Sequence, residues 1–248
     1  TNTLRPDVEY RWTSRISTGL GYEWRHVRFA EDSIGDLIDR DEHIVTGSVF
    51  WKFNPRADIG LNYGYGRTTF ETSDRDYTRH RATVSLRGDV TPRITSSLRV
   101  GYEWREPDRS DQESGNSVFL GGDISYRPTD RTQLTLMVDR SMQESTFGTT
   151  TFYTTTAAQL TARHQLLPKL SLGARVGGGL NDYSQKETVG NKTDFRQDTF
   201  VVVGGDVEYN IQRWLRVGLE YLYDSRNSNF PLFDFVDHRV IGKVTLQF

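Results

Sequence analysis

The sequence contains no cysteine, so it has neither disulfides nor thiolate metal ligands. It also lacks long hydrophobic runs. The longest purely apolar stretch, 200–203, is far shorter than the ~18 residues that a membrane-spanning helix needs. Apolar residues make up only 35% of the chain, below the ~45–50% of an ordinary soluble domain. The formal net charge of −2 provides no general attraction to nucleic acid.

The low apolar content has two explanations, disorder or a fold without a large apolar core. Aromatic residues make up 12% of the chain, and Val, Ile, Leu and Tyr recur throughout, which argues against disorder. A barrel with lipid outside and water inside needs no large core. No secretory signal peptide begins the sequence, so we expect a mature or partial chain.

Short turn signals recur along the chain at nearly regular intervals. Each ends in a basic residue, and these lie 37 to 44 positions apart: Arg15, Arg56, Arg93, Arg131, Lys169 and Arg213. Longer polar stretches alternate with them, near 31–43, 73–77, 106–116, 144–150, 185–195 and 225–236. Their Asp, Ser, Asn, Gly and Thr residues favour exposed loops. Membrane barrels show this asymmetry between short turns and long loops.

The segments between turns and loops alternate between apolar and polar residues, which predicts β-strands. In 94–105, Leu98 and Val100 fall on one face, whereas Arg99 falls on the other. No apolar stripe with helical spacing persists. Thirteen strands are predicted, near 4–12, 16–30, 43–53, 58–72, 78–90, 94–106, 117–127, 132–144, 150–166, 170–184, 196–210, 214–225 and 237–248.

The predicted fold class is all-β, an antiparallel up-and-down transmembrane β-barrel that forms one domain over residues 1–248. The first and last predicted strands run in the same direction, whereas bacterial single-chain barrels have an even strand number. We therefore expect 14 or more strands in the complete barrel, with at least one N-terminal strand outside this sequence. The alternative is a 12-strand barrel with residues 1–14 as a tail, against which the likeness of 8–10 to 207–209 argues.

Strand length and aromatic placement favour lipid over a soluble sandwich. Several strands reach 10–14 residues, against ~5–6 in soluble sheets. Ten residues at a tilt of ~40° climb about 25 Å, the height of an apolar membrane band. Aromatic residues at both ends of the apolar face predict two girdles at the lipid boundaries, although cross-strand aromatic pairing is another reading. The girdle candidates are Tyr10, Trp12, Tyr22, Trp24, Trp51, Tyr63, Tyr65, Tyr102, Trp104, Tyr126, Tyr209, Tyr221 and Tyr223.

The opposite face is too charged to form a dry core, because desolvating such groups costs several kcal/mol each even when they are paired. A water-filled lumen removes that cost. The predicted lumen-lining residues are Arg25, Lys52, Arg81, Arg87, Arg99, Glu103, Arg105, Asp123, Asp139, Arg163, Arg175, Asp206, Arg216, Glu220 and Lys243. The whole charged face also carries the carboxylates of Glu9, Glu23, Asp89, Glu208 and Asp224, so its positive and negative charges are nearly balanced and strong ion selectivity does not follow.

Signatures of enzymes and cofactor sites are missing from the sequence. It contains no Walker loop, no GxSxG and no HExxH, and its five histidines have no ligand spacing. We predict no catalytic residues, no metal and no cofactor. A rim hydrolase using Asp41 with His43, Asp76 with His80, or Asp237 with His238 is the weakest alternative. The apolar patch 230–235 in a predicted loop is expected to pack on its own rim, the alternatives being a constriction of the mouth or a partner contact.

The tight-turn pattern, the two Gly-Tyr-Glu-Trp-Arg strands at 21–25 and 101–105, and the terminal Phe248 resemble the β-barrel porin family associated with exopolysaccharide gene clusters. The resemblance implies an outer-membrane channel or polysaccharide exporter and carries no catalytic residues. Phe248 resembles the C-terminal signal that the barrel assembly machinery reads. The expected partners are outer-membrane lipid, that machinery, and an envelope protein or polysaccharide, with no nucleic acid.

Two further hypotheses stay open from the sequence. One is a structural barrel that is plugged by, or sleeves, another protein. The other is a soluble β-propeller, whose blades recur every ~40–45 residues but need four short strands per repeat. Only two long strands per repeat are visible here.

Overall fold

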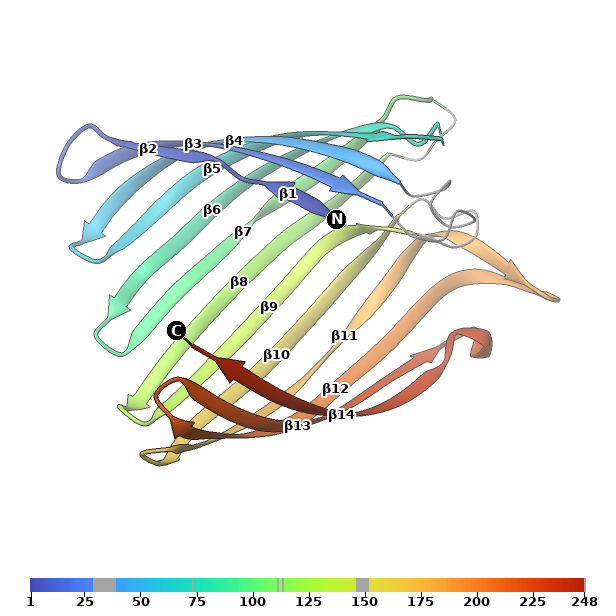
Figure 1. The fold of residues 1–248 in the computed structure, drawn as a ribbon. Helices are drawn as coiled ribbons and strands as arrows, with labels where there is room; N and C mark the ends of the chain where they lie inside the picture. Colours follow the sequence, from blue (N-terminus) through green and yellow to red (C-terminus); the bar gives the residue numbers. More distant parts are fainter. Residues whose placement is uncertain (29–38, 73, 111, 113, 146–151, 248) are drawn as a thin grey trace.

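A computed structural model describes residues 1–247 except 29–38, 73, 111, 113 and 146–151. Nearly all of the described chain lies in one antiparallel sheet (Figure 1). No described helix is long and apolar enough to cross a membrane. The elements are β1 (Asn2–Leu4), β2 (Asp7–Arg11), β3 (Ile16–Val27), β4 (Arg40–Asn54), β5 (Ala57–Phe70), β6 (Tyr77–Thr91), β7 (Ile94–Pro107), β8 (Gly115–Thr129), β9 (Thr132–Glu144), β10 (Phe152–Leu167), β11 (Leu170–Val189), β12 (Lys192–Gln212), β13 (Leu215–Ser228), the 3₁₀ helix η1 (Pro231–Phe233) and β14 (Phe235–Leu246).

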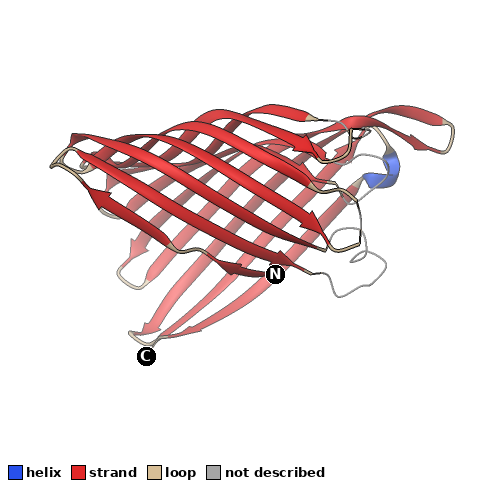
Figure 2. Ribbon diagram, turned by 90° about the horizontal axis from the view of Figure 1, so that it is seen from above, coloured by secondary structure: helices blue, strands red, loops and turns tan. Residues whose placement is uncertain are grey.

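The strands follow one another in the sheet in sequence order from β3 to β14, while β1 and β2 both pair with β3. The predicted all-β, antiparallel, up-and-down architecture is therefore confirmed. The sheet is strongly curled, as the two views show (Figures 1 and 2). Among the described residues no pairing joins β14 to β1 or β2, so the curled sheet is not closed.

The first predicted strand is interrupted. Residues 4–12 were expected to form one strand, but β1 pairs with Trp24–His26 and β2 pairs separately with Ser17–Gly21. Pro6 lies between them and has no N–H to donate to the ladder. Its carbonyl still accepts a bond from the Tyr22 N–H, at 3.0 Å, so the chain stays beside β3 across the break.

The recurring turn signals form the short connections at one end of the sheet. In four of these turns a Thr or Asn side-chain oxygen accepts a bond from the N–H of the basic residue two positions later. The shortest such bond, 2.7 Å, joins Arg56 N–H to Asn54 Oδ1. This local bond closes the turn and fixes the register of the strands on either side. The sequence repeat is thus a repeat of turn chemistry.

One predicted loop is wrong. Residues 185–195 were expected to form a long loop, but β11 and β12 continue as a ladder to Val189 and Lys192. Gly190 adopts φ +61° in the two-residue connection, a conformation that glycine tolerates best. The hydroxyls of Thr188 and Thr193 hydrogen-bond across the ladder at 2.8 Å. The sequence analysis missed this hairpin because its residues are mostly polar and do not alternate with apolar residues on one face.

The two faces of the sheet differ in curvature as well as in chemistry. The side chain of Arg87 on β6 lies 2.8 Å from that of Glu9 on β2, with three strands between them. Tyr77 on β6 likewise donates a 2.7 Å bond to Glu144 on β9. Neighbouring strands lie about 4.8 Å apart, so these side chains meet only if their face curves inward. The charged face is therefore concave and the aliphatic face convex.

The apolar patch 230–235 packs on the rim of the sheet. Phe230 is 2% exposed and lies beneath Lys192, whose Nζ is 4.6 Å from the ring centroid. In η1, Phe233 stacks under the guanidinium of Arg196 at 3.5 Å. Both cations belong to β12, so the segment is held by the neighbouring hairpin.

Candidate functional site

The concave face is the candidate functional surface. Strand registers place all fifteen predicted lumen residues on this one face, together with Glu9 and Glu42. Glu144 joins them through its side-chain contacts with Tyr77 and Arg105. One row of paired residues, for example, runs Phe50, Gly60, Ser85, Arg99 across β4 to β7. The period-two pattern therefore sorted these residues correctly by face. Their contact with a transported solute stays a prediction.

Most charges on the β3–β9 part of this face are compensated. Arg87 bridges Asp58 and Glu9 at 2.9 and 2.8 Å. Arg81 pairs with Glu103, whose side chain is 1% exposed. Arg105 pairs at 2.6 Å with Glu144, and Arg25 joins Glu23 and Glu42. Pairing offsets the desolvation cost that an isolated buried charge would carry.

The β10–β14 part of the face carries a second network. Arg163 contacts Asp206 and Glu208 at 3.3 and 3.1 Å. Glu220, with a side chain 4% exposed, is held between Arg175 and Lys243. These contacts skip a strand in two cases, from β10 to β12 and from β11 to β13. The predicted residues of this half are thus brought together.

Aromatic rings on the concave face were missed by the sequence analysis. Phe50 and Phe119 lie under the guanidiniums of Arg87 and Arg81, at 3.5 and 3.9 Å. Tyr77 lies under Arg105 at 3.3 Å. Such stacking immobilises a guanidinium while leaving its edge free to donate. The period-two pattern could have placed these rings inside, but aromatic residues were sought at the lipid boundary.

Arg79, Arg196 and Asp198 were also missed. Arg79 lies two positions before Arg81 and shares its face, so the same alternation would have found it. Arg196 and Asp198 are 1% and 0% exposed and form a pair at 2.6 Å. They lie at the start of the predicted strand 196–210 and share the face of Asp206, so the same alternation would have found them.

The convex face carries the girdle candidates. All thirteen fall there, in two groups near opposite ends of the strands. Between the groups, large aliphatic side chains face outward, with Leu61 65% and Val100 51% exposed. Water would penalise such a surface, whereas hydrocarbon would not. Their role as boundary anchors stays a prediction.

Three histidines on the convex face have tyrosine partners. His43, His80 and His238 each share a hydrogen bond of 2.7 or 2.8 Å with a tyrosine on the neighbouring strand: Tyr22, Tyr63 and Tyr221. The Asp–His pairs of the hydrolase alternative are therefore not assembled at these histidines. Asp41 bonds His26 instead of His43, and Asp237 contacts Arg239.

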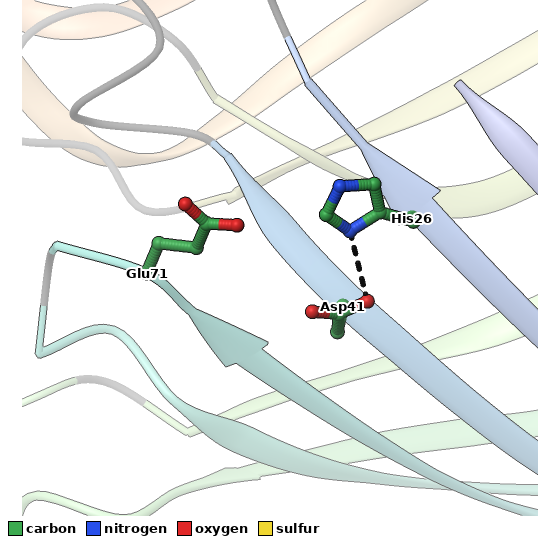
Figure 3. A group of neighbouring side chains, drawn as sticks. All are labelled: His26, Asp41 and Glu71. Atoms are coloured by element: carbon green, nitrogen blue, oxygen red, sulfur yellow. Dashed lines mark hydrogen bonds and ion pairs between the residues drawn. The ribbon is translucent and has the colours of Figure 1, made fainter.

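One group in the described part of the chain has metal-ligand composition. The ligand atoms of His26, Asp41 and Glu71 lie within 4.8 Å of one another at the loop end of β3 to β5 (Figure 3). Asp41 accepts bonds of 3.0 Å from His26 Nδ1 and Trp24 Nε1, and Glu71 pairs with Arg28 at 2.9 Å. Protein groups thus already satisfy both carboxylates.

The same loop end carries exposed ion pairs. Arg67 donates to Asp108 at 2.6 Å, and this hydrogen bond lowers the pKa of the Asp108 carboxyl below its usual value. Phe248, the predicted assembly signal, lies outside the described residues.

Comparison with known proteins places this architecture in context. Residues 88–248 match the model of a family described as "Putative beta-barrel porin 2". No curated protein sequence matches the chain significantly.

Solved outer-membrane barrels share the fold. The outer membrane channel DcaP of Acinetobacter baumannii is 14% identical with a TM-score of 0.56, covering 100% of this chain and 85% of its own. The siderophore receptor PirA from Pseudomonas aeruginosa is 12% identical with a TM-score of 0.50, and the match covers 90% of this chain. This chain spans only 52% of that receptor's length. At such identities the likeness shows the fold alone.

Proposed function

The chain belongs to this β-barrel porin family and resides in the bacterial outer membrane, and from that premise we propose that it conducts hydrophilic solutes along the concave face of its sheet. The observation that supports this most is the separation of the two faces. Charged and hydroxyl side chains cover the concave face across all the strands, whereas exposed aliphatic side chains cover the convex face. A solvated path bordered by lipid requires that arrangement.

The charges of the concave face would set a moderate selectivity. Rings of charged side chains select ions in other pores. Here most cations are paired with carboxylates on the same face, as in Arg81–Glu103 and Arg163–Asp206. Paired charges cancel at a distance, so the field felt by a passing solute comes from the few groups without a partner.

Polysaccharide export is the finer form of the proposal. Support comes from the family resemblance and from the hydroxyl and amide groups of Thr46, Ser48 and Asn62 beside stacked arginines, a surface that suits sugar hydroxyls. Assembly in the membrane would use Phe248 as the signal for the barrel assembly machinery. Outer-membrane lipid would cover the convex face.

Reconstitution in planar bilayers tests the function. The proposal predicts discrete current steps in potassium chloride, with Arg99→Glu shifting the reversal potential under a salt gradient toward cation preference. A silent protein that remains folded and co-purifies with a stoichiometric envelope protein would instead indicate a structural barrel. Arg67→Gln, in an exposed rim pair, is the matched control because its charge lies on the convex side of β5.

A further inference from the structure

The concave wall contains a hollow of about 360 Å³ between β4 and β7. Four arginines line it: Arg79, Arg81, Arg87 and Arg99. They follow β6 and β7 as a ladder, because Arg79 and Arg81 lie above the row that pairs Ser85 with Arg99, and Arg87 lies below it. At ~3.3 Å per residue the ladder extends roughly 26 Å along the strand direction.

Two arginines of this ladder have no direct ion-pair partner among the described residues, although Glu42, Glu103 and Glu144 act on Arg79 at longer range. Arg81 pairs with Glu103, and Arg87 pairs with Asp58 and Glu9. Neither Arg79 nor Arg99 makes a hydrogen bond or ion pair with any residue that the structure describes. The one carboxylate among the described lining residues is Glu23, which is already bonded to Arg5 and Arg25. The hollow therefore holds an excess of positive charge.

Neutral donors and fixed guanidiniums complete the hollow. Asn62 donates to Ser85 Oγ at 3.0 Å, and other hydroxyls line the same wall. Phe50 stacks on Arg87 and fixes the plane of its guanidinium, which already donates to Asp58 and Glu9. Phe50 packs against Gly60, where an added Cβ would lie 2.6 Å from the ring. The glycine therefore makes room for the phenylalanine ring that stacks on Arg87.

We propose that this hollow binds the carboxylate, phosphate or sulfate group of an anionic solute, with Arg79 and Arg99 as its principal ligands. Guanidinium donors match such groups in geometry, and unpaired arginines gain the most from them. Asp123 and Asp139 on the adjoining β8 and β9 face the same lumen and confine the anion to the arginine wall. The inference rests on the proposed conduction path and gives its cargo a chemical class.

Binding is measured on detergent-solubilised protein by calorimetry, which needs no conduction. The probes are inorganic phosphate, an oligogalacturonate and a malto-oligosaccharide of equal length. We expect the oligogalacturonate to bind and the neutral oligosaccharide to bind at least tenfold more weakly. Phosphate binding alone would identify a small-anion site, whereas preference for the oligogalacturonate would identify acidic saccharides. Equal affinity for charged and neutral saccharides, without phosphate binding, would overturn the proposal.

Variants assign the site to its residues. Arg79→Gln with Arg99→Gln should weaken anion binding at least tenfold, while Arg163→Gln, which removes a paired cation from the same face, should change it less than twofold. Without anion, the double variant should be about as thermally stable as the wild type, because neither arginine makes a direct ion pair with a described residue. If the double variant does not fold, Arg99→Lys, a substitution at an exposed position, provides a second test. It should weaken anion binding, because the lysine ammonium lacks the paired, planar N–H donors of the guanidinium. Unchanged binding in a folded variant would overturn the proposal. Anion binding without bilayer current would contradict the proposed conduction path and leave the proposed anion site intact.

Discussion

At the scale of single residues, the arginines of the concave face divide into two kinds. Some neutralise buried carboxylates, as Arg175 does for Glu220. Others, such as Arg99, have no partner among the described residues. The sequence analysis treated the two alike, because alternation reports the face of a residue and not its neighbours across a strand.

This division predicts different effects of the same substitution. Arg175→Ala should lower the free energy of unfolding by about 1–3 kcal/mol, because Glu220 keeps only Lys243 as a partner. Arg99→Ala should change it by less than about 0.5 kcal/mol. Denaturant unfolding in lipid vesicles, followed by tryptophan fluorescence, measures both.

A double variant provides the control. If Arg175→Ala acts through the ion pair, it should cost less stability in a Glu220→Gln background than in the natural chain, since the partner of Arg175 is already absent there. Equal destabilisation by the Arg99 and Arg175 variants would contradict the distinction between them.

At the scale of elements, the turns carry much of the register. Asn54→Ala should destabilise the protein by about 1 kcal/mol, because the N–H of Arg56 loses its side-chain acceptor. Asn54→Asp keeps an acceptor and should cost less than about 0.5 kcal/mol. The same unfolding assay separates these outcomes, and a larger loss in the aspartate variant would argue against the turn bond.

Most of the fold could be predicted from sequence because alternation and turn chemistry are local properties. Twelve of the thirteen predicted segments match single strands from β3 to β14. The hairpin at 185–195 escaped because both of its faces are polar. The break at Pro6 was not predicted, because the segment otherwise alternates like a strand and a single proline interrupts it.

The candidate site was only partly predictable. Which residues share a face follows from period two, but contacts such as Arg87–Glu9 depend on the curvature of the whole sheet. Phe50 and Phe119 were not expected beside arginines, because stacking across strands leaves no trace in the local sequence.

At the scale of the whole molecule, the arrangement of a soluble protein is inverted. Among the described residues 17 polar or charged side chains are buried against nine hydrophobic ones, and no Leu or Ile is among the nine. The aliphatic side chains instead lie exposed on the convex face. Such a sheet lacks an aliphatic core, so lipid contact has to supply the apolar environment.

The assignment of solvent to the two faces can be measured directly, because the natural chain has no cysteine and single cysteines label cleanly. Nitroxides would be attached at Leu98→Cys, Arg99→Cys and Val100→Cys in bilayer-reconstituted protein, and their collisions with dissolved oxygen and a water-soluble nickel chelate compared. The account predicts that labels at 98 and 100 meet oxygen and the label at 99 meets the chelate. Labels at 98 and 100 that meet the chelate, or meet neither reagent within a dry interior, would contradict it.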